Sequence, residues 1–473
     1  MNDDTVANAT HAIEACPHQH FLRKTSMKRQ HLRHLLRRGG LPGQLVIQLT
    51  DRCNATCPQC GMNINERFPR HSLPLDDVKR MIDAAAQRGI AAVSFTGGEP
   101  LLVLRDLVAL INHAGAAGIA FIRTGTNGFV FRSHEKHDFP DRIHRLAETL
   151  AATPLRNFWI SIDSADPATH EKMRGFPGVI RGIERALPIF HRYGLFPSAN
   201  LGINRNLDGP GSILVLANGI PGDKGVPAAI FRERLHSGLS RFFQFVAGIG
   251  FSTANVCYPM SIAEDGGSGD LNAVYGATAT SAIVSFPSRE KAHLFDVLGQ
   301  SVRENRARLR IFTPLCALDA LKRQFRHGER GYPCRGGKDF FFVDAVTGHT
   351  YPCGYRGEED LGVFGDRPAM PGGDSRACYA CEWECFRDPS ELGGPFQDMV
   401  RHPIKCLRRW RQDAGFIKLW LKDLHYYQAC DFFDGRRPVR PERLRRFARG
   451  NEIQPADREL TPSFDSNGMV IRR

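Results

Sequence analysis

The chain has 473 residues, of which 42% are hydrophobic and 24% are charged, and its formal net charge is +13. This length can bury a large core and predicts two or three domains, while the apolar fraction argues against global disorder. No apolar run approaches the ~18 residues of a transmembrane helix, and the N-terminus lacks the apolar region of a secretory signal. Thirteen cysteines in such a chain favour reduced thiols and metal binding over disulfides, and hence a cytoplasmic protein.

The positive charge is concentrated in two segments near the ends of the chain. Residues 23–38 carry seven basic residues and no acid, and residues 401–449 carry fourteen basic and five acidic residues. The rest of the chain therefore carries a small net negative charge. Such a run of basic residues is usually a solvated surface, and contact with an acidic partner is the alternative. We expect residues 1–43 to form a basic extension with one helix at residues 22–36.

Strand and helix patterns alternate from residue 44 onward. Apolar, β-branched runs predict strands at residues 45–50, 92–95, 119–124, 158–162 and 196–203. Amphipathic runs between them predict helices at residues 74–89, 106–117, 143–151 and 182–193. Regular alternation with short connections indicates an α/β fold with a parallel sheet, although residues 204–254 fit the repeat poorly. Residues 290–308 have the pattern of a long surface helix, and residues 265–270 have the composition of a flexible loop.

The C-terminal third has a different pattern. Residues 340–343 and 350–351 predict a short hairpin joined at residues 344–348. Farther on, seven apolar residues recur at helical spacing among arginines and lysines, namely Ile404, Leu407, Trp410, Ala414, Ile417, Leu421 and Leu424. This basic amphipathic pattern predicts a helix that packs on its own domain. The alternative is a helix that lies on a membrane surface or an acidic partner.

Three cysteines follow the first predicted strand. Cys53, Cys57 and Cys60 have C-x3-C-x2-C spacing, and a loop after a strand can aim several thiolates at one point. Three thiolates are one fewer than the four that usually hold a [4Fe–4S] cluster, so one iron is left open to another ligand. A zinc site or a reduced thiol cluster is the alternative, but zinc prefers four closed ligands, commonly in C-x2-C pairs.

This spacing resembles the signature of the radical S-adenosylmethionine (radical SAM) superfamily. The resemblance implies that the amino and carboxylate groups of S-adenosylmethionine (SAM) chelate the open iron. In that family the residue before the third cysteine is usually aromatic, whereas this chain has Gln59. The resemblance also implies a partial (β/α)6 barrel, of which the alternation of strands and helices would be the repeat.

A glycine-rich turn adds to the resemblance. Gly97, Gly98 and Glu99 come directly after the second predicted strand, about forty residues beyond the cysteines. Glycines allow a positive φ and a close approach of the backbone to a ligand, although a lone turn of this kind would be ordinary. In the family a turn at this position binds the amino group of SAM, so the resemblance assigns that role to these three residues.

Polar residues after the next two strands complete the expected SAM site. Asn127 follows the third predicted strand, Ser161 and Asp163 lie at the end of the fourth, and Arg174 comes shortly after. Polar side chains at the C-terminal ends of parallel strands face the site in barrel folds. By position, the resemblance places Ser161, Asp163 and Arg174 near the ribose and carboxylate of SAM. A cap or turn role is the alternative for each of these residues.

A second set of cysteines lies in the C-terminal part. Cys334 and Cys353 are followed by Cys378 and Cys381 at C-x2-C spacing, and then by Cys385. Four thiolates can close a [4Fe–4S] cluster completely, although a C-x2-C pair also suits zinc. The run resembles the auxiliary-cluster region called the SPASM or twitch domain, and its one-cluster twitch form fits better. We include Cys385 among the candidate ligands; it substitutes for Cys381, ligates in an altered arrangement, or is a free thiol near the substrate.

The resemblance divides the chain into four parts. Residues 1–43 are the basic extension, residues 44–310 the radical SAM partial barrel, residues 311–390 a small twitch-like domain, and residues 391–473 a basic helical region. Cys257 and Cys316 have no partners at ligand spacing. Because lone cysteines are usually small buried apolar residues, we expect that role for both, with a place in the active site as the alternative.

The implied activity is reductive cleavage of SAM at a [4Fe–4S] cluster. The resulting 5′-deoxyadenosyl radical takes a hydrogen atom from a small-molecule, lipid or sugar-like substrate, and an auxiliary [4Fe–4S] cluster accepts an electron or anchors the substrate. A maturase that modifies a ribosomally made peptide and a non-catalytic iron–sulfur carrier are the alternatives. The implied partner is a low-potential electron donor of the flavodoxin or ferredoxin type. We do not expect nucleic acid as a partner, because the basic flanks show no recognised RNA-binding motif.

Overall fold

The computed structural model describes residues 41–63, 70–213, 227–259, 271–274, 281–366 and 377–448, together with the short strands β10 (Ser463–Phe464) and β11 (Val470–Ile471). The helix expected at residues 22–36 and the loop expected at residues 265–270 lie outside the described residues. Within the described part, no helix is long and apolar enough to cross a membrane.

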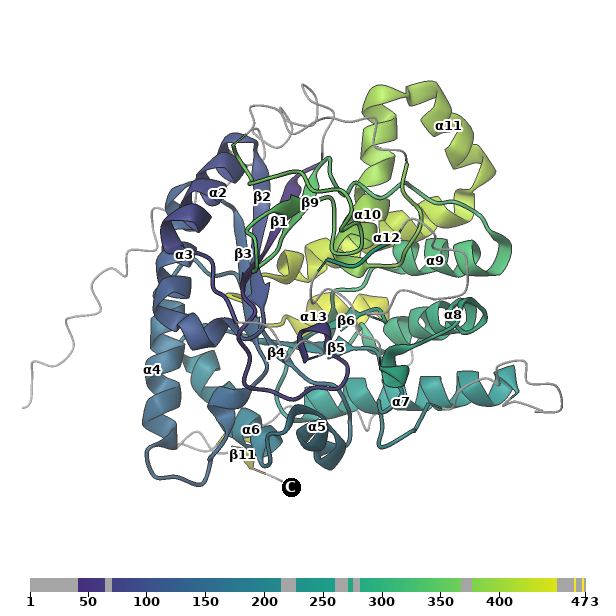
Figure 1. The fold of residues 1–473 in the computed structure, drawn as a ribbon. Helices are drawn as coiled ribbons and strands as arrows, with labels where there is room; N and C mark the ends of the chain where they lie inside the picture. The colour runs from purple at the N-terminus through teal and green to yellow at the C-terminus, as the bar shows by residue number, and fades with distance from the viewer. Residues whose placement is uncertain are drawn as a thin grey trace, which may run out of the picture.

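One nine-stranded sheet organises the molecule (Figure 1). Its strands lie in the order β7-β6-β5-β4-β3-β2-β1-β8-β9. Their bounds are β1 (Gly43–Thr50), β2 (Ile90–Gly97), β3 (Phe121–Thr126), β4 (Asn157–Ser161), β5 (Ser198–Gly202), β6 (Thr253–Cys257), β7 (Arg310–Ile311), β8 (Phe340–Val343) and β9 (Thr350–Tyr351). Strands β1 to β7 run parallel, β8 pairs parallel with β1, and only β9 is antiparallel to its neighbour.

Helices connect the successive parallel strands up to β8 and pack on one face of the sheet, and further helices follow β9. Their bounds are α2 (Leu75–Gln87), α3 (Leu104–Ala116), α4 (Phe139–Ala151), α5 (Pro167–Arg174), α6 (Val179–Arg192), α7 (Ala228–Gly248), α8 (Ser288–Asn305), α9 (Leu315–His327), α10 (Glu384–Arg401), α11 (Pro403–Gln412), α12 (Ala414–Ala429) and α13 (Pro441–Leu444). Leu45, Ile47 and Leu49 of β1 point into the large core beneath these helices.

The opposite face of the sheet carries the C-terminal part of the chain. Val46 alternates with Leu45 and Ile47, so its side chain points away from the helical core. It packs in a second cluster with Phe340, Trp383 and other residues of the cysteine-rich region. The segment with the second cysteine set therefore lies against the inner face of the sheet, where it also adds β8 beside β1.

The predicted strand–helix alternation is confirmed over residues 44–203, and the hairpin has the predicted bounds. Residues 204–254, which fitted the repeat poorly, nevertheless continue it, because α7 leads into β6. The sheet crosses the expected domain boundary at residue 310, since β8 belongs to the same sheet as β1. The division into separate domains stays a prediction.

The helix predicted at residues 290–308 is confirmed as α8, but its predicted position on the surface is wrong. Helix α8 lies between α7 and α9, and Glu290 and Lys291 are only 0% and 3% exposed. Their charges are paired: Arg205 Nη2 lies 2.5 Å from Glu290 Oε2, and Lys291 Nζ lies 2.5 Å from Glu382 Oε1. A buried charge is tolerated only when an opposite charge pairs with it. The helical pattern of the sequence alone did not reveal these partners.

The single helix expected over residues 404–424 is also wrong in part. Helices α11 and α12 meet at Asp413, whose side chain accepts the backbone N–H of Phe416 and so caps α12. Phe416 and Trp420 form the buried face of α12, whereas Ile404 on α11 is 75% exposed. The chain therefore packs α12 on the fold and leaves much of α11 in solvent.

Candidate active site

The first three cysteines lie on the loop that leaves β1. Cys57 is buried, while Cys53 and Cys60 are half-buried. Burial is the main cause that raises the pKa of Cys57 to about 12; Arg174 opposes this shift, and the nearby thiols of Cys60 and Cys53 contribute to it. The three thiols therefore lie close enough to act on one another. Such buried sulfurs become thiolates only when a positive group such as iron compensates their charge, so this donor set suits an iron–sulfur cluster.

The glycine turn holds this loop in place. Gly98 N–H donates to the carbonyl of Thr50 at 2.6 Å, and Glu99 N–H donates to the carbonyl of Arg52 at 2.8 Å. Gly97 has a φ of +135°, and a Cβ atom there would stand 2.1 Å from the Thr50 carbonyl oxygen. Only glycine allows this backbone conformation and this close approach. The turn thus anchors the first residues of the cysteine loop.

Glu99 is completely buried and bonds to two backbone amides. Its Oε1 accepts the N–H of Leu101 at 3.0 Å, and its Oε2 accepts the N–H of Asn127 at 2.6 Å. Burial raises the pKa of Glu99 to about 7, although the two amides oppose the shift. The carboxylate therefore ties the turn after β2 to the end of β3. Its expected contact with the amino group of SAM stays a prediction.

Asn127 connects the end of β3 to the cysteine loop. Its Nδ2 donates to the sulfur of Cys53 at 3.5 Å and to Oδ1 of Asn54 at 3.0 Å. An amide that donates to a sulfur favours the thiolate form, as a cluster ligand needs. Ser161 is half-buried at the end of β4 and pairs in register with Asn200 of β5.

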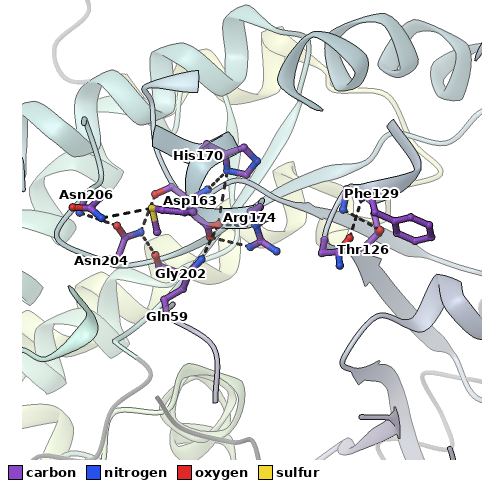
Figure 2. Close-up of polar contacts among 12 residues, drawn as sticks. Gln59, Thr126, Phe129, Asp163, His170, Arg174, Gly202, Asn204 and Asn206 are labelled. Carbon is purple, nitrogen blue, oxygen red and sulfur yellow. Dashed lines mark hydrogen bonds and ion pairs between the residues drawn. The ribbon is translucent and has the colours of Figure 1, made fainter. Parts of the chain in front are cut away.

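Figure 2 shows a buried ion pair between Asp163 and Arg174. Arg174 donates through Nε to Asp163 Oδ2 at 2.7 Å and through Nη2 to Asp163 Oδ1 at 3.0 Å. Gln59 Nε2 donates to the same Oδ2 at 2.9 Å, and the Asp163 backbone N–H donates to His170 Nδ1 at 3.1 Å. Gln59, at the position that is usually aromatic, thus fixes the cysteine loop to the end of β4.

The electrostatics of this ion pair favour a charged Arg174 and a neutral His170. Burial alone would lower the pKa of Arg174, but Asp163 and Cys57 together raise it. Burial lowers the pKa of His170 to about 4, so its ring is neutral and accepts the Asp163 amide. The structure thereby brings Asp163 and Arg174 close to Cys57, as the sequence predicted for a common site.

A family comparison decides what this arrangement is: residues 47–204 match the family model described as the Radical SAM superfamily. Residues 47–204 therefore form a radical SAM domain. The matched region contains the cysteine loop, the glycine turn, Asn127 and the Asp163–Arg174 pair.

Individual relatives cover different shares of the chain. The GTP 3′,8-cyclase of Synechococcus sp. (strain CC9902) is 36% identical over 138 residues, which are 29% of this chain and 36% of that protein. The AdoMet-dependent heme synthase of Methanosarcina barkeri is 23% identical over 372 residues, which are 75% and 87% of the two chains. The structure of Streptococcus suis SuiB has 17% sequence identity and a TM-score of 0.44, and covers 69% of this chain and 64% of its own. The chain thus spans about a third of the length of that cyclase.

The second cysteine set lies on the inner face of the radical SAM sheet. Burial raises the pKa of Cys334, Cys353 and Cys381, that of Cys353 to about 12, and neighbouring thiols of the set, Cys378 among them, act in the same direction. Cys334 also donates its backbone N–H to the carbonyl of Cys378 at 2.9 Å. The structure therefore gathers four thiols that the sequence spreads over 48 residues.

Backbone amides point at three of these sulfurs. The N–H of Tyr355 donates to Cys353 Sγ at 3.4 Å, and the sulfurs of Cys334 and Cys381 likewise accept backbone hydrogen bonds. Amides two residues after a cysteine stabilise a thiolate and suit a ligand of a metal cluster. Among the residues that the structure describes, no three His, Cys, Asp or Glu side chains already surround a single metal position. Ligation by either set stays a prediction.

Cys385 packs on the same cluster as three of these thiols but bonds to a carboxylate. Its Sγ donates to Glu384 Oε1 at 3.4 Å, and its main charge interactions are with Glu384, Arg123 and Asp388. Of the three roles considered for Cys385, this position favours a free thiol. Cys316 is fully buried beside Tyr332, as expected for an apolar core residue.

Sequence reasoning missed the polar residues of the inner sheet face. Residues paired in register on neighbouring parallel strands point to the same side. The register connects Val46 through Ser94 to Arg123, and connects Asn200 of β5 with Asn255 of β6. Cys257 follows Asn255 on the same face, two residues on. The available signal was a polar residue at alternate positions of otherwise apolar strands.

Proposed function

We propose that this radical SAM protein binds SAM at the Cys53–Cys57–Cys60 loop and removes a hydrogen atom from a polar substrate inside the barrel. When bound, the [4Fe–4S] cluster and SAM supply the 5′-deoxyadenosyl radical that takes this atom. The observation that carries the proposal is the fixed cysteine loop: the glycine turn holds one end, and Gln59 and the Asp163–Arg174 pair hold the other. Gly97, Gly98 and Glu99 would hold the amino end of SAM, and Ser161, Asp163 and Arg174 its ribose and carboxylate.

The inner face of the sheet supports a polar substrate over a lipid chain. It presents Arg123, Ser161, Asn200 and Asn255, each on a different strand from β3 to β6. Arg123 lies over the ring of Trp159 at 5.1 Å, and its Nε has no hydrogen-bond partner among the described residues. Buried polar groups need partners, and a substrate with hydroxyl, carboxylate or amide groups would supply them.

The second cysteine set supports an auxiliary [4Fe–4S] cluster held by Cys334, Cys353, Cys378 and Cys381. Burial raises the pKa of Cys334 and of Cys353, and the guanidinium groups of Arg387, which is 1% exposed, and of Arg356 oppose these shifts. Two guanidinium groups beside four thiols would offset the negative charge of such a cluster. The proposed partner is a low-potential electron donor, and the reducing cytoplasm is the compartment that suits twelve free thiols among the described residues.

Anaerobic reconstitution followed by incubation with SAM and dithionite tests the proposal. We expect 5′-deoxyadenosine and methionine in equal amounts, and about eight irons per chain if both clusters form. A non-catalytic carrier would bind iron and release neither product. A stimulation of 5′-deoxyadenosine formation by a peptide, but by no small polar molecule, would favour the maturase alternative.

A further inference from the structure

Two cysteines that are not among the four grouped thiols meet at one carboxylate. Cys257 ends β6 on the inner face of the sheet, and Cys385 lies in the first turn of α10. The thiol of Cys385 donates to Glu384 Oε1 at 3.4 Å, and the charge of Glu384 also acts on the thiol of Cys257. The Cys257 thiol further approaches Asn200 Oδ1 at 3.5 Å. Residues far apart in the sequence thus form one thiol–carboxylate–thiol site.

This site has an unused polar atom. Glu384 is 8% exposed, and its Oε2 has no hydrogen-bond partner among the described residues. Because a buried oxygen without a partner is costly, this atom marks a place where a substrate group or a proton belongs. Arg123, which acts electrostatically on both Glu384 and Cys385, reaches the same place from β3.

Both thiols are in the protonated form. Burial and the neighbouring Glu384 raise the pKa of Cys257 and of Cys385 well above the usual value for cysteine. Thiolates bind metals and attack electrophiles, whereas a neutral thiol can give up a hydrogen atom. An S–H bond is also weaker than most C–H bonds, so a carbon radical takes its hydrogen readily.

We propose that Cys257 returns a hydrogen atom to a carbon radical in the barrel, with Cys385 and Glu384 renewing its S–H bond. This inference rests on the proposed function. In the first step the S–H bond of Cys257 breaks, a C–H bond forms on the substrate, and the unpaired electron stays on the sulfur. That sulfur then takes the hydrogen atom of Cys385. One electron from the low-potential donor and one proton from the Glu384 carboxyl restore the Cys385 thiol, and water reprotonates Glu384 when product leaves.

The position of Cys257 sets the class of reaction. The SAM loop follows β1, whereas Cys257 ends β6, and four strands lie between them in the sheet. A substrate between the two is therefore approached from different sides when hydrogen is removed and when it is returned. The net change is inversion at a carbon that bears one hydrogen, in a polar molecule whose other groups bond to Arg123 and the asparagines.

Deuterium transfer without any substrate tests the donor. The reconstituted protein is incubated with SAM and dithionite in D2O, and 5′-deoxyadenosine is analysed by mass spectrometry. In wild type the exchanged S–D group of Cys257 should place one deuterium in the product. Cys257→Ser keeps the shape and the polar contact but has an O–H bond too strong to donate, so the deuterium should be lost while 5′-deoxyadenosine still forms. Cys430→Ser, a change at another buried cysteine, should keep it.

A second measurement needs no SAM. Anaerobic oxidation with diamide in alkaline buffer, in which part of the thiols ionise, should link Cys257 to Cys385, and peptide mapping should find this disulfide in wild type and not in Cys385→Ser. Equal deuterium in wild type and Cys257→Ser, or the absence of the link, would overturn the proposal. If wild type forms no 5′-deoxyadenosine at all, the proposed function fails, and the cross-link alone decides whether the two thiols meet.

The restoring role of Glu384 has its own readout. Glu384→Gln keeps the shape of the side chain and removes its transferable proton. The first turnover should still place deuterium in 5′-deoxyadenosine, whereas later turnovers should place much less, because the thiols are not restored. If Glu384 had a purely structural role, the variant would change deuterium transfer in the first and in later turnovers alike. That result would show that Glu384 does not restore the thiols.

Discussion

The two groups of thiols are held in different ways. Cys53, Cys57 and Cys60 lie on a loop without strand or helix, and turns and side chains from β2, β3 and α5 fasten that loop from outside. Cys334, Cys353, Cys378 and Cys381 are gathered by backbone pairing, and their own following amides point at the sulfurs. An open, externally supported loop suits a cluster that must bind a further ligand. A closed, self-supported set suits one with no free position.

Removal of the loop thiols should produce the largest effect. Changing Cys53, Cys57 and Cys60 together to Ala should abolish SAM cleavage, because no other described thiol can hold that cluster. The protein should retain about four irons in the second set. Iron analysis and 5′-deoxyadenosine assays measure the two results separately. Loss of all iron from a folded variant would show that the two sets are not independent.

A matched pair of variants sharpens the assignment of the second set. Cys353→Ala should remove about four irons and leave some uncoupled SAM cleavage, since this thiol belongs to the closed set. Cys385→Ala changes the same chemical group only a short distance away and should leave the iron content at that of wild type. Zinc in the second set, or equal iron loss in both variants, would contradict this division.

Lowering the pH should destabilise the structure around the first group of thiols before that around the second group. The pKa of His170 is lowered to about 4 by burial, so the folded protein binds fewer protons there than the unfolded chain between about pH 6.5 and pH 4. The free energy of unfolding should therefore fall as pH drops through this window, by at most about 3 kcal/mol from this group. His170→Gln should flatten that dependence in urea unfolding experiments at pH 7 and pH 4.5.

The control for this prediction is His327→Gln, at the exposed end of α9, which should keep the wild-type dependence on pH. The second site relies on backbone amides, which do not titrate in this range. If the free energy of unfolding of His170→Gln depends on pH as strongly as that of wild type, another titratable group causes the dependence.

The smallest effect concerns an exposed apolar surface on helix α11, which follows the second group of thiols in the chain. On α11, Ile404 and Leu407 are 75% and 59% exposed and are flanked by basic residues with no acid on the helix. We expect weak, salt-sensitive binding to anionic liposomes, since each basic residue near such a surface contributes about 1 kcal/mol. Arg408→Gln with Arg411→Gln should reduce co-sedimentation. Arg409 is left unchanged, because it lies over the ring of Tyr332 at 3.9 Å.

Arg80→Gln with Arg105→Gln is the matched control, since it removes the same charge from exposed positions on α2 and α3. It should sediment like wild type. No binding at low salt, or equal loss in both double variants, would leave α11 as a solvated helix of the fold.

Local patterns were sufficient to predict strands β1 to β5, the hairpin of β8 and β9 and both groups of cysteines, but not strands β6 and β7. Strand β1, the glycine turn and the cysteine spacing are encoded within short windows, and their chemistry restricts the alternatives. Burial of α8 was not predictable in this way, because the partners of Glu290 and Lys291 come from distant segments. The break between α11 and α12 depends on Asp413, which caps α12. The apolar spacing continues across this residue and therefore did not indicate a break.

The thiol–carboxylate–thiol site shows the same limit. Cys257 looked like a lone cysteine and Cys385 like a candidate ligand of the second set, and only the register of β5 and β6 and the position of α10 bring them to Glu384. Spacing rules find ligands that are neighbours in sequence. They cannot find a pair that the fold assembles from distant segments.

The pairing of β8 with β1 has a consequence for how the chain folds. Strand β1 lies between β2 and β8. One edge of β1 therefore has no hydrogen-bonded neighbour until residues 340–343 have been synthesised and have paired with it. During synthesis β1 is an edge strand with Val46 uncovered, and such edges recruit other chains. Contacts between residues so far apart in sequence also slow folding. A chain that ends near residue 310 would keep this edge permanently, and would be prone to aggregate even with every residue of the SAM site in place.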